Sequence, residues 1–290
     1  MSKQDKRDLR AQQAQQQQRE IRNQEKQRRR QEKLIAANQK KIQEQFPVED
    51  IDRNGPVDVA CLIHSNGYSW NYVERLFNMV VRNLSRPVRF HVYTEHDRSV
   101  PPHMIKHNLD EWPNVFGPRK SWWYKIQLFN SELFQGQLLY FDLDTVIVGN
   151  LDWITQLHTK FMWAPKDFRS LWRPTHTGIN SSIMWFDTRA FSYIYKDFVT
   201  RNLEHTLRSF HGDQDFISET VDSRLLRFFP PDAALSWRWQ AKDGGMNFKN
   251  RLYLAPDTGT KFTNSTSILI FHGNPKPHEV TDPVILNFWQ

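Results

Sequence analysis

The sequence predicts an α/β protein built around a mostly parallel β-sheet, and two observations support this fold class. The first is a set of strand-length runs, such as VDVACLI at residues 57–63, that are apolar at nearly every position. Strands have this composition when both faces of their sheet are covered. The second is that these runs alternate with segments in which apolar residues recur at helical spacing.

The expected elements follow in chain order. Residues 70–84 read as a helix with Val73, Leu76, Phe77, Val80 and Val81 on one face. Residues 88–94 (VRFHVYT) read as a second strand, and a helical segment at 122–134 leads into a strand that carries FDLDT, residues 141–145. Later strands are expected at 161–165, 179–186, 226–229 and 267–272, with helices at 189–203 and 213–221.

The first 46 residues differ in kind from the rest. Residues 1–46 hold 13 Lys or Arg, 6 Asp or Glu and 13 Gln, with no Gly or Pro. This composition predicts a solvated helix or a disordered arm. The arm is either a solubilising tail or an electrostatic tether to anionic lipid, worth about 1 kcal/mol per basic residue near the surface. Pro47 and Pro56 mark the change to a globular domain, residues 47–290.

Composition excludes several classes of function. The net charge of +7 lies entirely in residues 1–46, so the globular part offers no basic face for nucleic acid. The chain has no apolar run of about 18 residues and no apolar signal core near its N-terminus. A single cysteine, Cys61, fits a reducing compartment. We therefore expect a cytoplasmic protein, with peripheral contact to the inner face of the membrane if the tail is a tether.

Asp142 and Asp144 interrupt an apolar stretch in which charge is costly. Side chains two residues apart in a strand lie on the same face, so the two carboxylates repel unless a cation or a proton lies between them. Oxygen ligands of this kind suit Mn²⁺ or Mg²⁺. The alternative is that the pair caps a turn or is neutralised by Lys and Arg.

The residues around this pair resemble the donor-site region of family 8 glycosyltransferases, and four further segments resemble that family in the same order. The matching residues begin with Leu62, His64 and Tyr68, continue through Lys125, Leu128, Phe129, residues 139–145 and 149–151, and end with GINSSIMWFD (178–187), GDQDF (212–216) and FHGNPKP (271–277). The resemblance covers roughly residues 57–278. It implies the glycosyltransferase A fold, with a Rossmann-like nucleotide-binding half.

The resemblance also implies roles for individual residues. The donor would be a nucleotide diphosphate sugar, most often a UDP-sugar, used with retention of anomeric configuration. The implied catalytic residues are Gln214 and Asp213, and the implied substrate-binding residues are Leu62, His64, Tyr68, Lys125, Asp142, Asn180, Gly273 and Lys276. The acceptor would be a glycan, a lipid-linked saccharide or a protein.

The third metal ligand is a point of departure from the family pattern. The family has a histidine three residues before its signature glycine, but here that position is Ile270. His272 lies two residues later, on the same face of an extended strand as Ile270. We therefore expect the metal ligands to be Asp142, Asp144 and His272, with a satisfied, non-ligating His272 as the alternative.

Two other functions remain open from the sequence. FDLDT also fits the haloacid-dehalogenase phosphatases, in which the first aspartate is a nucleophile and the second a general acid. That motif usually opens its domain, whereas here α/β sequence precedes it. The third hypothesis is a catalytically inactive scaffold. Trp122, Trp123, Trp237 and Trp239 fit either core packing or contact with a sugar.

Overall fold

The computed structural model describes residues 55–115, 120–242 and 259–290, the strand positions 246, 247, 252 and 253, and positions 22 and 26. The chain divides into two units, Met1–Ile51 and Asp52–Gln290. In the first unit only Arg22 and Lys26 are described, and both are helical and exposed. The predicted arm therefore lies almost entirely outside the described residues.

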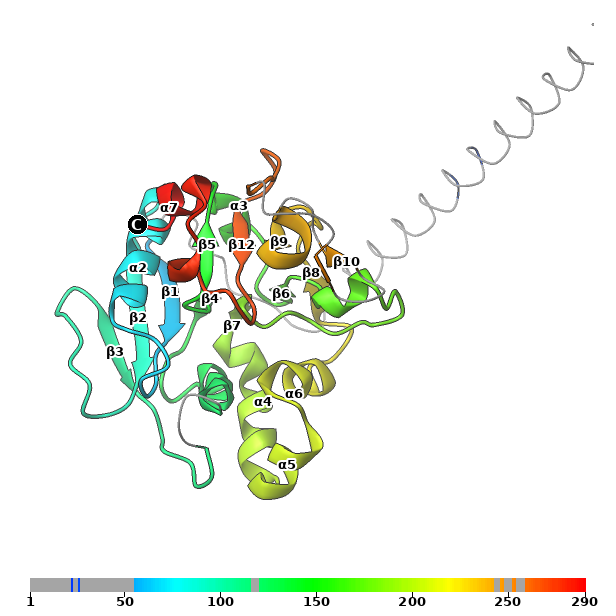
Figure 1. The fold of residues 1–290 in the computed structure, drawn as a ribbon. Coiled ribbons are helices and arrows are strands. Elements are labelled where there is room, and N and C mark those ends of the chain that lie inside the picture. Colours follow the sequence, from blue (N-terminus) through cyan, green and yellow to red (C-terminus); the bar gives the residue numbers. More distant parts are fainter. Residues whose placement is uncertain are drawn as a thin grey trace, which may run out of the picture. The chain divides into compact units, whose positions relative to one another are not determined.

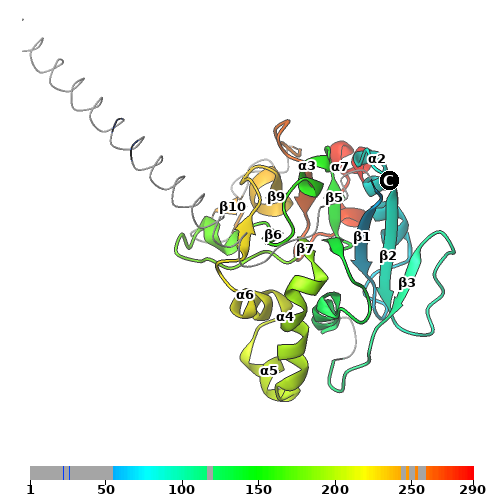
Figure 2. The same cartoon turned by 180° about the vertical axis from the view of Figure 1, so that it is seen from behind.

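A seven-stranded sheet forms the centre of this unit, in the order β3-β2-β1-β4-β7-β6-β8 (Figure 1). Its strands are β1 Val57–Leu62, β2 Val88–Thr94, β3 Ile105–Asn108, β4 Gln137–Phe141, β6 Met162–Ala164, β7 Ile183–Asp187 and β8 Leu226–Phe228. Four of the six neighbouring pairs are parallel, and β7 is antiparallel to both β4 and β6. β3 lies at one edge of the sheet, as Figure 2 also shows.

The strand expected to carry FDLDT is two strands. β4 ends at Phe141, and Asp142 to Asp144 form a turn. The chain then enters a second sheet as β5, Thr145–Ile147. That sheet has the order β5-β12-β9, with β9 at Ala234–Ser236 and β12 at Ile268–Ile270. The two aspartates therefore lie in a turn between sheets and not within one strand, which corrects the sequence-based prediction.

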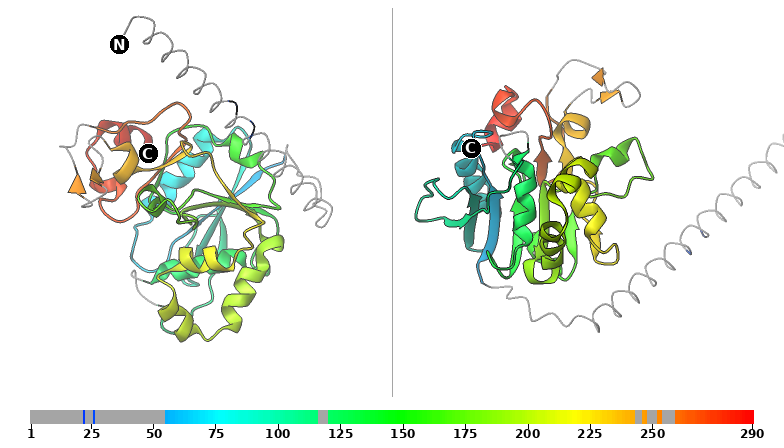
Figure 3. Two further views of the ribbon diagram at one scale, coloured as in Figure 1. Left: turned by 90° about the vertical axis from the view of Figure 1, so that its right-hand side faces the viewer. Right: turned by 90° about the horizontal axis from the view of Figure 1, so that it is seen from below.

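Two hydrophobic cores cover the two faces of the central sheet. Successive side chains of a strand point to opposite faces. Accordingly, Leu139 and Phe141 pack in the core that also contains α2 (Asn71–Asn83), whereas Leu138 and Tyr140 pack in the core that contains η1 (Ser121–Phe129). Figure 3 shows α2 on one side of the sheet and α4, α5 and α6 on the other. The apolar strands of the sequence are thus buried on both faces.

The remaining elements lie around these layers. They are α3 Asp152–Thr155, η2 Phe168–Leu171, α4 Thr188–Thr200, α5 Leu203–Ser209, α6 Asp213–Thr220, η3 Trp237–Ala241, η4 Pro277–Glu279 and α7 Pro283–Phe288, with a two-stranded sheet of β10 Met246–Asn247 and β11 Leu252–Tyr253. Within the described part of the chain, we find no helix with the length and apolar character needed to cross a membrane.

Two helix predictions require correction. The segment predicted as a helix over 122–134 is a 3-10 helix that begins at Ser121 and ends at Phe129, and all of its side chains from Trp123 onward are buried. The segment predicted as one helix over 189–203 ends at Thr200. Asn202 then caps a separate helix, α5, by accepting a hydrogen bond from the His205 amide.

Candidate active site

The candidate site lies where the sheet changes its direction of growth. The chain runs from β1 to β2 and β3 on one side, and β4 is added on the other side of β1. In open α/β sheets a ligand site forms outside the carboxyl ends of the strands at such a point. Here the carboxyl ends of β1 and β4 are Leu62 and Phe141, and the turn with Asp142 and Asp144 follows directly.

Two cavities meet at this edge of the sheet. The first, of about 320 Å³, contacts Leu62, His64, Gly67, Tyr68, Ser121, Trp122, Lys125, Tyr140, Asp142, Leu143, Asp144 and Lys276. The second, of about 440 Å³, contacts Trp122, Lys125, Asp142, Arg169, Asn180, Ser181, Ser182, His211, Gly212, Asp213, Gln214, Asp215 and His272. Trp122, Lys125 and Asp142 border both, so the two cavities are parts of one site.

Lys125 is the charged centre of the junction. Its Nζ lies 2.9 Å from Asp142 Oδ1 and 3.1 Å from Asp213 Oδ2, and it donates to Ser181 Oγ at 3.2 Å. Burial by itself lowers the pKa of this ammonium, but Asp142 and Asp213 outweigh burial and raise the pKa above its usual value. Lys125, a residue of η1, is therefore a cation that lies between two carboxylates.

Asp213 occupies the first turn of α6, where a carboxylate also interacts favourably with the helix N-terminus. Its Oδ2 accepts a hydrogen bond from Ser181 Oγ at 2.7 Å. Burial raises the pKa of this carboxyl, Lys125 lowers it and Asp142 raises it, and the net direction is upward. The predicted catalytic residue Asp213 thus lies in the same buried charge cluster as Lys125 and Asp142.

Asp144 forms a second charge cluster, on the side of the first cavity. Its Oδ2 accepts hydrogen bonds from Tyr68 Oη at 2.8 Å and from Lys276 Nζ at 2.5 Å. Burial raises the pKa of Asp144, Lys276 lowers it, and Asp142 raises it because the two carboxylates repel. Tyr68 and Lys276, far apart in the sequence, therefore converge on one carboxylate oxygen.

The segment that carries Lys276 follows β12 directly. Gly273 has a φ of +73°, a left-handed conformation that glycine adopts without steric cost, and this turns the chain toward the site. A Cβ at Gly273 would lie 3.8 Å from Arg238, so the glycine is not required for space. Gly273 borders neither cavity, and its predicted substrate contact stays a prediction.

Gln214 and Asn180 lie in the second cavity. Gln214 Oε1 accepts from the Ser181 amide at 3.2 Å, and its Nε2 donates to Asp167 Oδ2 at 2.8 Å. Because both ends of the amide are hydrogen-bonded, the orientation of the Gln214 side chain is fixed. Asn180 Oδ1 accepts from the Ser182 amide at 3.1 Å.

Asp167, which the sequence reasoning did not single out, accepts the hydrogen bond that holds Gln214. Besides Gln214, its carboxylate accepts from the Arg169 backbone amide at 2.8 Å and from the Arg169 side chain at 2.7 Å, and it pairs with His176 Nε2 at 2.8 Å. Burial alone raises the pKa of Asp167, but these hydrogen bonds lower it below its usual value. The only sequence signal was the Asp-Phe-Arg order, which is common at helix starts and points to no partner.

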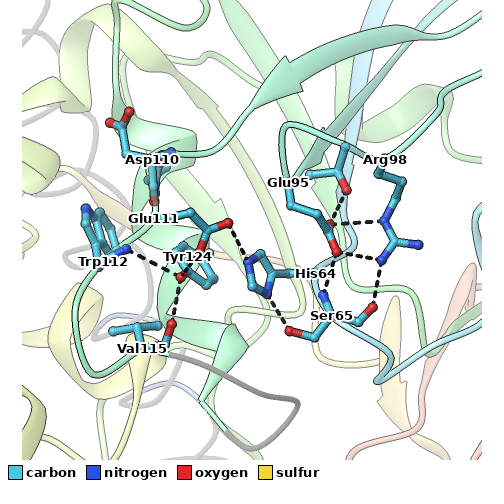
Figure 4. Close-up of polar contacts among 11 residues, drawn as sticks. His64, Ser65, Glu95, Arg98, Asp110, Glu111, Trp112, Val115 and Tyr124 are labelled. Atoms are coloured by element: carbon cyan, nitrogen blue, oxygen red, sulfur yellow. Dashed lines mark hydrogen bonds and ion pairs between the residues drawn. The ribbon is translucent and has the colours of Figure 1, made fainter.

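The loop after β1 shapes the other end of the first cavity (Figure 4). The ring of His64 stacks on Tyr124 with ring centroids 4.1 Å apart, and its Nε2 lies 3.1 Å from Glu111 Oε1. Ser65 has a φ of +58°, which is uncommon for a residue other than glycine. The Ser65 amide donates to Glu95 Oε1 at 3.0 Å, so Glu95 stabilises this conformation.

The residues beside the first cavity fit a hard divalent cation in part. Asp142 and Asp144 offer carboxylate oxygens, and a Mg²⁺ or Mn²⁺ ion commonly uses one or two such groups together with phosphate oxygens and water. The predicted third ligand lies elsewhere. His272 Nε2 shares a hydrogen bond of 2.6 Å with Ser236 Oγ, and its ring stacks on Phe168. Among the described residues, no group of three or more His, Cys, Asp or Glu is placed to hold a metal.

The structure thus brings together most of the residues predicted from the sequence. Leu62, His64, Tyr68, Asp144 and Lys276 border the first cavity, Asn180, Asp213, Gln214 and His272 border the second, and Lys125 and Asp142 border both. It does not bring His272 into one group with the two aspartates. A role for His272 as a metal ligand stays a prediction.

Comparisons with known proteins place the fold but not the family. No protein-family model matches the chain, and no curated protein matches it in sequence. Solved structures do match. The glycosyltransferase GlyE of Streptococcus pneumoniae TIGR4 aligns with a TM-score of 0.57 and 12% identity over 81% of this chain. An active-site mutant of LgtC aligns with a TM-score of 0.56 and 11% identity over 80% of this chain.

A third structure, the bifunctional glycosyltransferase WbbM, aligns with a TM-score of 0.52 and 14% identity over 80% of this chain. The chain spans 60% of the GlyE chain, 94% of the LgtC chain and 48% of the WbbM chain. At these identities the likeness shows the fold alone. The predicted α/β class, in its glycosyltransferase A form, is confirmed, whereas membership of family 8 stays a prediction.

Proposed function

We propose that the chain transfers a glycosyl group from a nucleotide diphosphate sugar, most simply a UDP-sugar, with Mn²⁺ or Mg²⁺ as cofactor. The observation that carries the proposal is the junction of the two cavities at Asp142 and Lys125, outside the carboxyl ends of β1 and β4. A nucleotide diphosphate sugar needs a pocket for the nucleoside, charge at the diphosphate and a polar pocket for the sugar. The two cavities and their shared charges match that order.

The chain's own residues supply most of the required chemistry. Lys125 provides a fixed positive charge beside Asp142, at the point where negative charge develops on the departing diphosphate. Lys276 provides a second cation and can leave Asp144 for a phosphate oxygen, because its side chain is partly exposed. The metal, held by Asp142 and Asp144, would act as a Lewis acid on the diphosphate.

In the second cavity, Asn180, Asp213 and Gln214 would bind the hydroxyls and the reacting carbon of the sugar. The fixed amide of Gln214 is suited to stabilise positive charge on that carbon, because its oxygen is a neutral dipole and its position is held by Ser181 and Asp167. Retention of configuration is part of the proposal through the family resemblance. The acceptor would be a glycan, a lipid-linked saccharide or a protein.

The same proposal places the enzyme in the cytoplasm. Cys61, the single cysteine, is buried and free, in keeping with a reducing compartment. The basic arm, residues 1–46, would bring the enzyme to anionic lipid at the inner face of the membrane. A liposome co-sedimentation assay with and without residues 1–46 tests this point, and equal binding of both forms would contradict it.

The proposed activity is tested by hydrolysis of a panel of UDP-sugars without acceptor, with Mn²⁺ and with EDTA. We expect metal-dependent release of UDP from at least one donor, reduced at least about a hundredfold in Asp144→Asn because one metal ligand loses its charge. A phosphatase assay with an aryl phosphate is the comparison. Aryl phosphate hydrolysis without UDP release would favour the phosphatase alternative, and absence of both activities together with absence of Mn²⁺ and UDP binding would favour an inactive scaffold.

A further inference from the structure

Trp122 is a large aromatic side chain that packs in neither core. It is 39% exposed, whereas the adjacent Trp123 is 2% exposed and packs against Phe198 and Phe216. Within the described ranges, Trp122 has no ring contact and no cation–π contact. Trp237 differs from it too, because that ring is buried and stacks on Phe271. Of the four tryptophans that the sequence left open, Trp122 is the most exposed.

Its position is specific. Trp122 is one of three residues that border both cavities, and the other two, Lys125 and Asp142, are charged. Under the proposed function, the diphosphate lies against those charges, and the glycosyl group leads from it into the second cavity. Trp122 therefore offers an apolar surface at the junction of the two cavities, where the glycosyl ring would follow the diphosphate.

The chemistry of a sugar ring matches this arrangement. A pyranose presents C–H bonds on its faces and hydroxyls around its rim. The C–H hydrogens carry partial positive charge and are attracted to the negative face of an aromatic ring. Apart from Gly212, the other residues of the second cavity, including Asn180, Asp213 and Gln214, have polar or charged side chains that suit the hydroxyls. One aromatic wall with polar groups around it is typical of an oriented small-molecule site.

Gly212 provides independent support for the position of the indole. A Cβ added at Gly212 would lie 3.2 Å from Trp122 Nε1, and the three nearest atoms to it all belong to Trp122. The backbone of Gly212 is extended, with a φ of −174°, so its conformation does not require glycine. The space that Gly212 leaves is therefore used by Trp122.

We infer that Trp122 is the wall on which the glycosyl ring of the donor stacks, and that Gly212 keeps the space for that wall. The inference rests on the proposed function and names the residue that determines which glycosyl groups fit. It gives Trp122 no part in binding the nucleoside or the diphosphate. Trp122 should therefore distinguish a nucleotide sugar from the nucleotide alone.

The test compares the affinities of UDP and of the UDP-sugar that the wild-type enzyme hydrolyses, by calorimetry with Mn²⁺. Trp122→Ala should lower the affinity for the UDP-sugar about tenfold and change the affinity for UDP by less than about twofold. Trp122→Phe should retain most of the affinity, because a ring face remains. Leu286→Ala, which truncates an exposed side chain on α7, is the matched surface control.

Gly212→Ala sharpens the test through a double-mutant cycle. Gly212→Ala should lower the affinity for the UDP-sugar in the wild-type background. In the Trp122→Ala background it should have no further effect, because the indole that the added methyl group would displace is absent. Equal weakening of UDP and UDP-sugar by Trp122→Ala, or unchanged affinity for both, would overturn the inference while the proposed function stands. Failure of the wild-type enzyme to bind any UDP-sugar would instead overturn the proposed function, and the inference with it.

Discussion

Two aspartate–lysine pairs meet at the junction of the cavities, and they differ in how firmly each lysine is held. The Lys125 side chain is 6% exposed and contacts two carboxylates, Asp142 at 2.9 Å and Asp213 at 3.1 Å. The Lys276 side chain is 24% exposed and contacts one carboxylate, Asp144. Lys125 is thus a buried lysine held by two carboxylates, whereas Lys276 is a partly exposed lysine held by one carboxylate.

This difference separates a charge that the fold itself requires from a charge that serves a ligand alone. Removing one member of a buried pair leaves the remaining charge without compensation, whereas a partly exposed pair is replaced by water at little cost. Lys125 should therefore be needed for folding as well as for function, and Lys276 for ligand binding alone.

Replacing Lys125 should have the largest effect on the fold. Lys125→Met removes the cation from the buried Asp213 and from the partly exposed Asp142, which keep hydrogen bonds from the Ser181 and Tyr140 hydroxyls. We expect the free energy of unfolding to fall by about 3–5 kcal/mol, chiefly through the uncompensated charge of Asp213. Urea denaturation followed by circular dichroism measures this, and Lys276→Met is the matched control. A Lys125→Met protein with wild-type stability would show that the buried cluster is not structural.

Releasing the Gln214 amide should reduce turnover without affecting stability to the same extent. In Asp167→Asn the amide of Gln214 loses its charged acceptor, and displacement of a positioned group by about 1 Å costs on the order of a hundredfold in rate. We expect kcat for donor hydrolysis to fall about 10- to 100-fold while the Kd of the donor changes less than about threefold.

Asp187→Asn is the matched control for that variant. Asp187 also accepts hydrogen bonds from the backbone and side chain of an arginine two residues later, Arg189, but no contact joins it to Gln214. Equal losses of kcat in the two variants would mean that Asp167 acts through local folding and not through Gln214.

Removing Lys276 should affect binding and leave the fold intact. Lys276→Met should change the free energy of unfolding by less than about 1 kcal/mol, since Lys276 is partly exposed and the buried Asp144 keeps its hydrogen bond from Tyr68. We expect the Kd of UDP to rise about tenfold through loss of a phosphate contact. Calorimetry measures the Kd of UDP. The control is Lys196→Met, which replaces an exposed lysine on α4. A stability loss equal to that of Lys125→Met would remove the distinction between the two pairs.

The smallest expected effect concerns the loop beyond the first cavity. Burial alone raises the pKa of Glu95, but hydrogen bonds from Arg98, Thr94 and the backbone outweigh it and lower the pKa to about 2. The folded state therefore binds a proton at Glu95 less readily than the unfolded state, whose value is 4.5. The stability this group contributes is present above pH 4.5 and is lost as the pH falls toward 2.

Because Arg98 is partly exposed, we expect this contribution to be about 1–2 kcal/mol after allowance for solvent screening. Glu95→Gln should lower stability at pH 7 by about this amount and flatten the acid side of the stability profile. Urea denaturation between pH 2.5 and 7 measures both effects. An unchanged slope of stability against pH in Glu95→Gln would assign the acid sensitivity to other carboxyls.

Several strands of the sheet could be predicted from local sequence pattern. The predicted strand at 88–94 coincides with β2, and those at 57–63 and 226–229 each extend one residue beyond β1 and β8. In β1 all residues but the last are buried, and the apolar run that such a strand needs is visible in the sequence without knowledge of its neighbours. Leu62 and Asp142, which were predicted as site residues, lie at or directly after the carboxyl ends of β1 and β4, and both border the first cavity.

Which of these residues come into contact depends on tertiary packing and could not be predicted from the sequence. Lys276 lies 132 residues from Asp144 in the chain, and Gln214 lies 47 residues from Asp167, yet each pair is within hydrogen-bond distance. The turn at Asp142 to Asp144 exists because the chain passes from one sheet to another, which no local periodicity records. Likewise, Trp122 and Trp123 are the same residue type in adjacent positions, and packing against α4 and α6 buries only Trp123. Local pattern predicts most of the elements, whereas their ends and the partners of each side chain depend on how the elements pack.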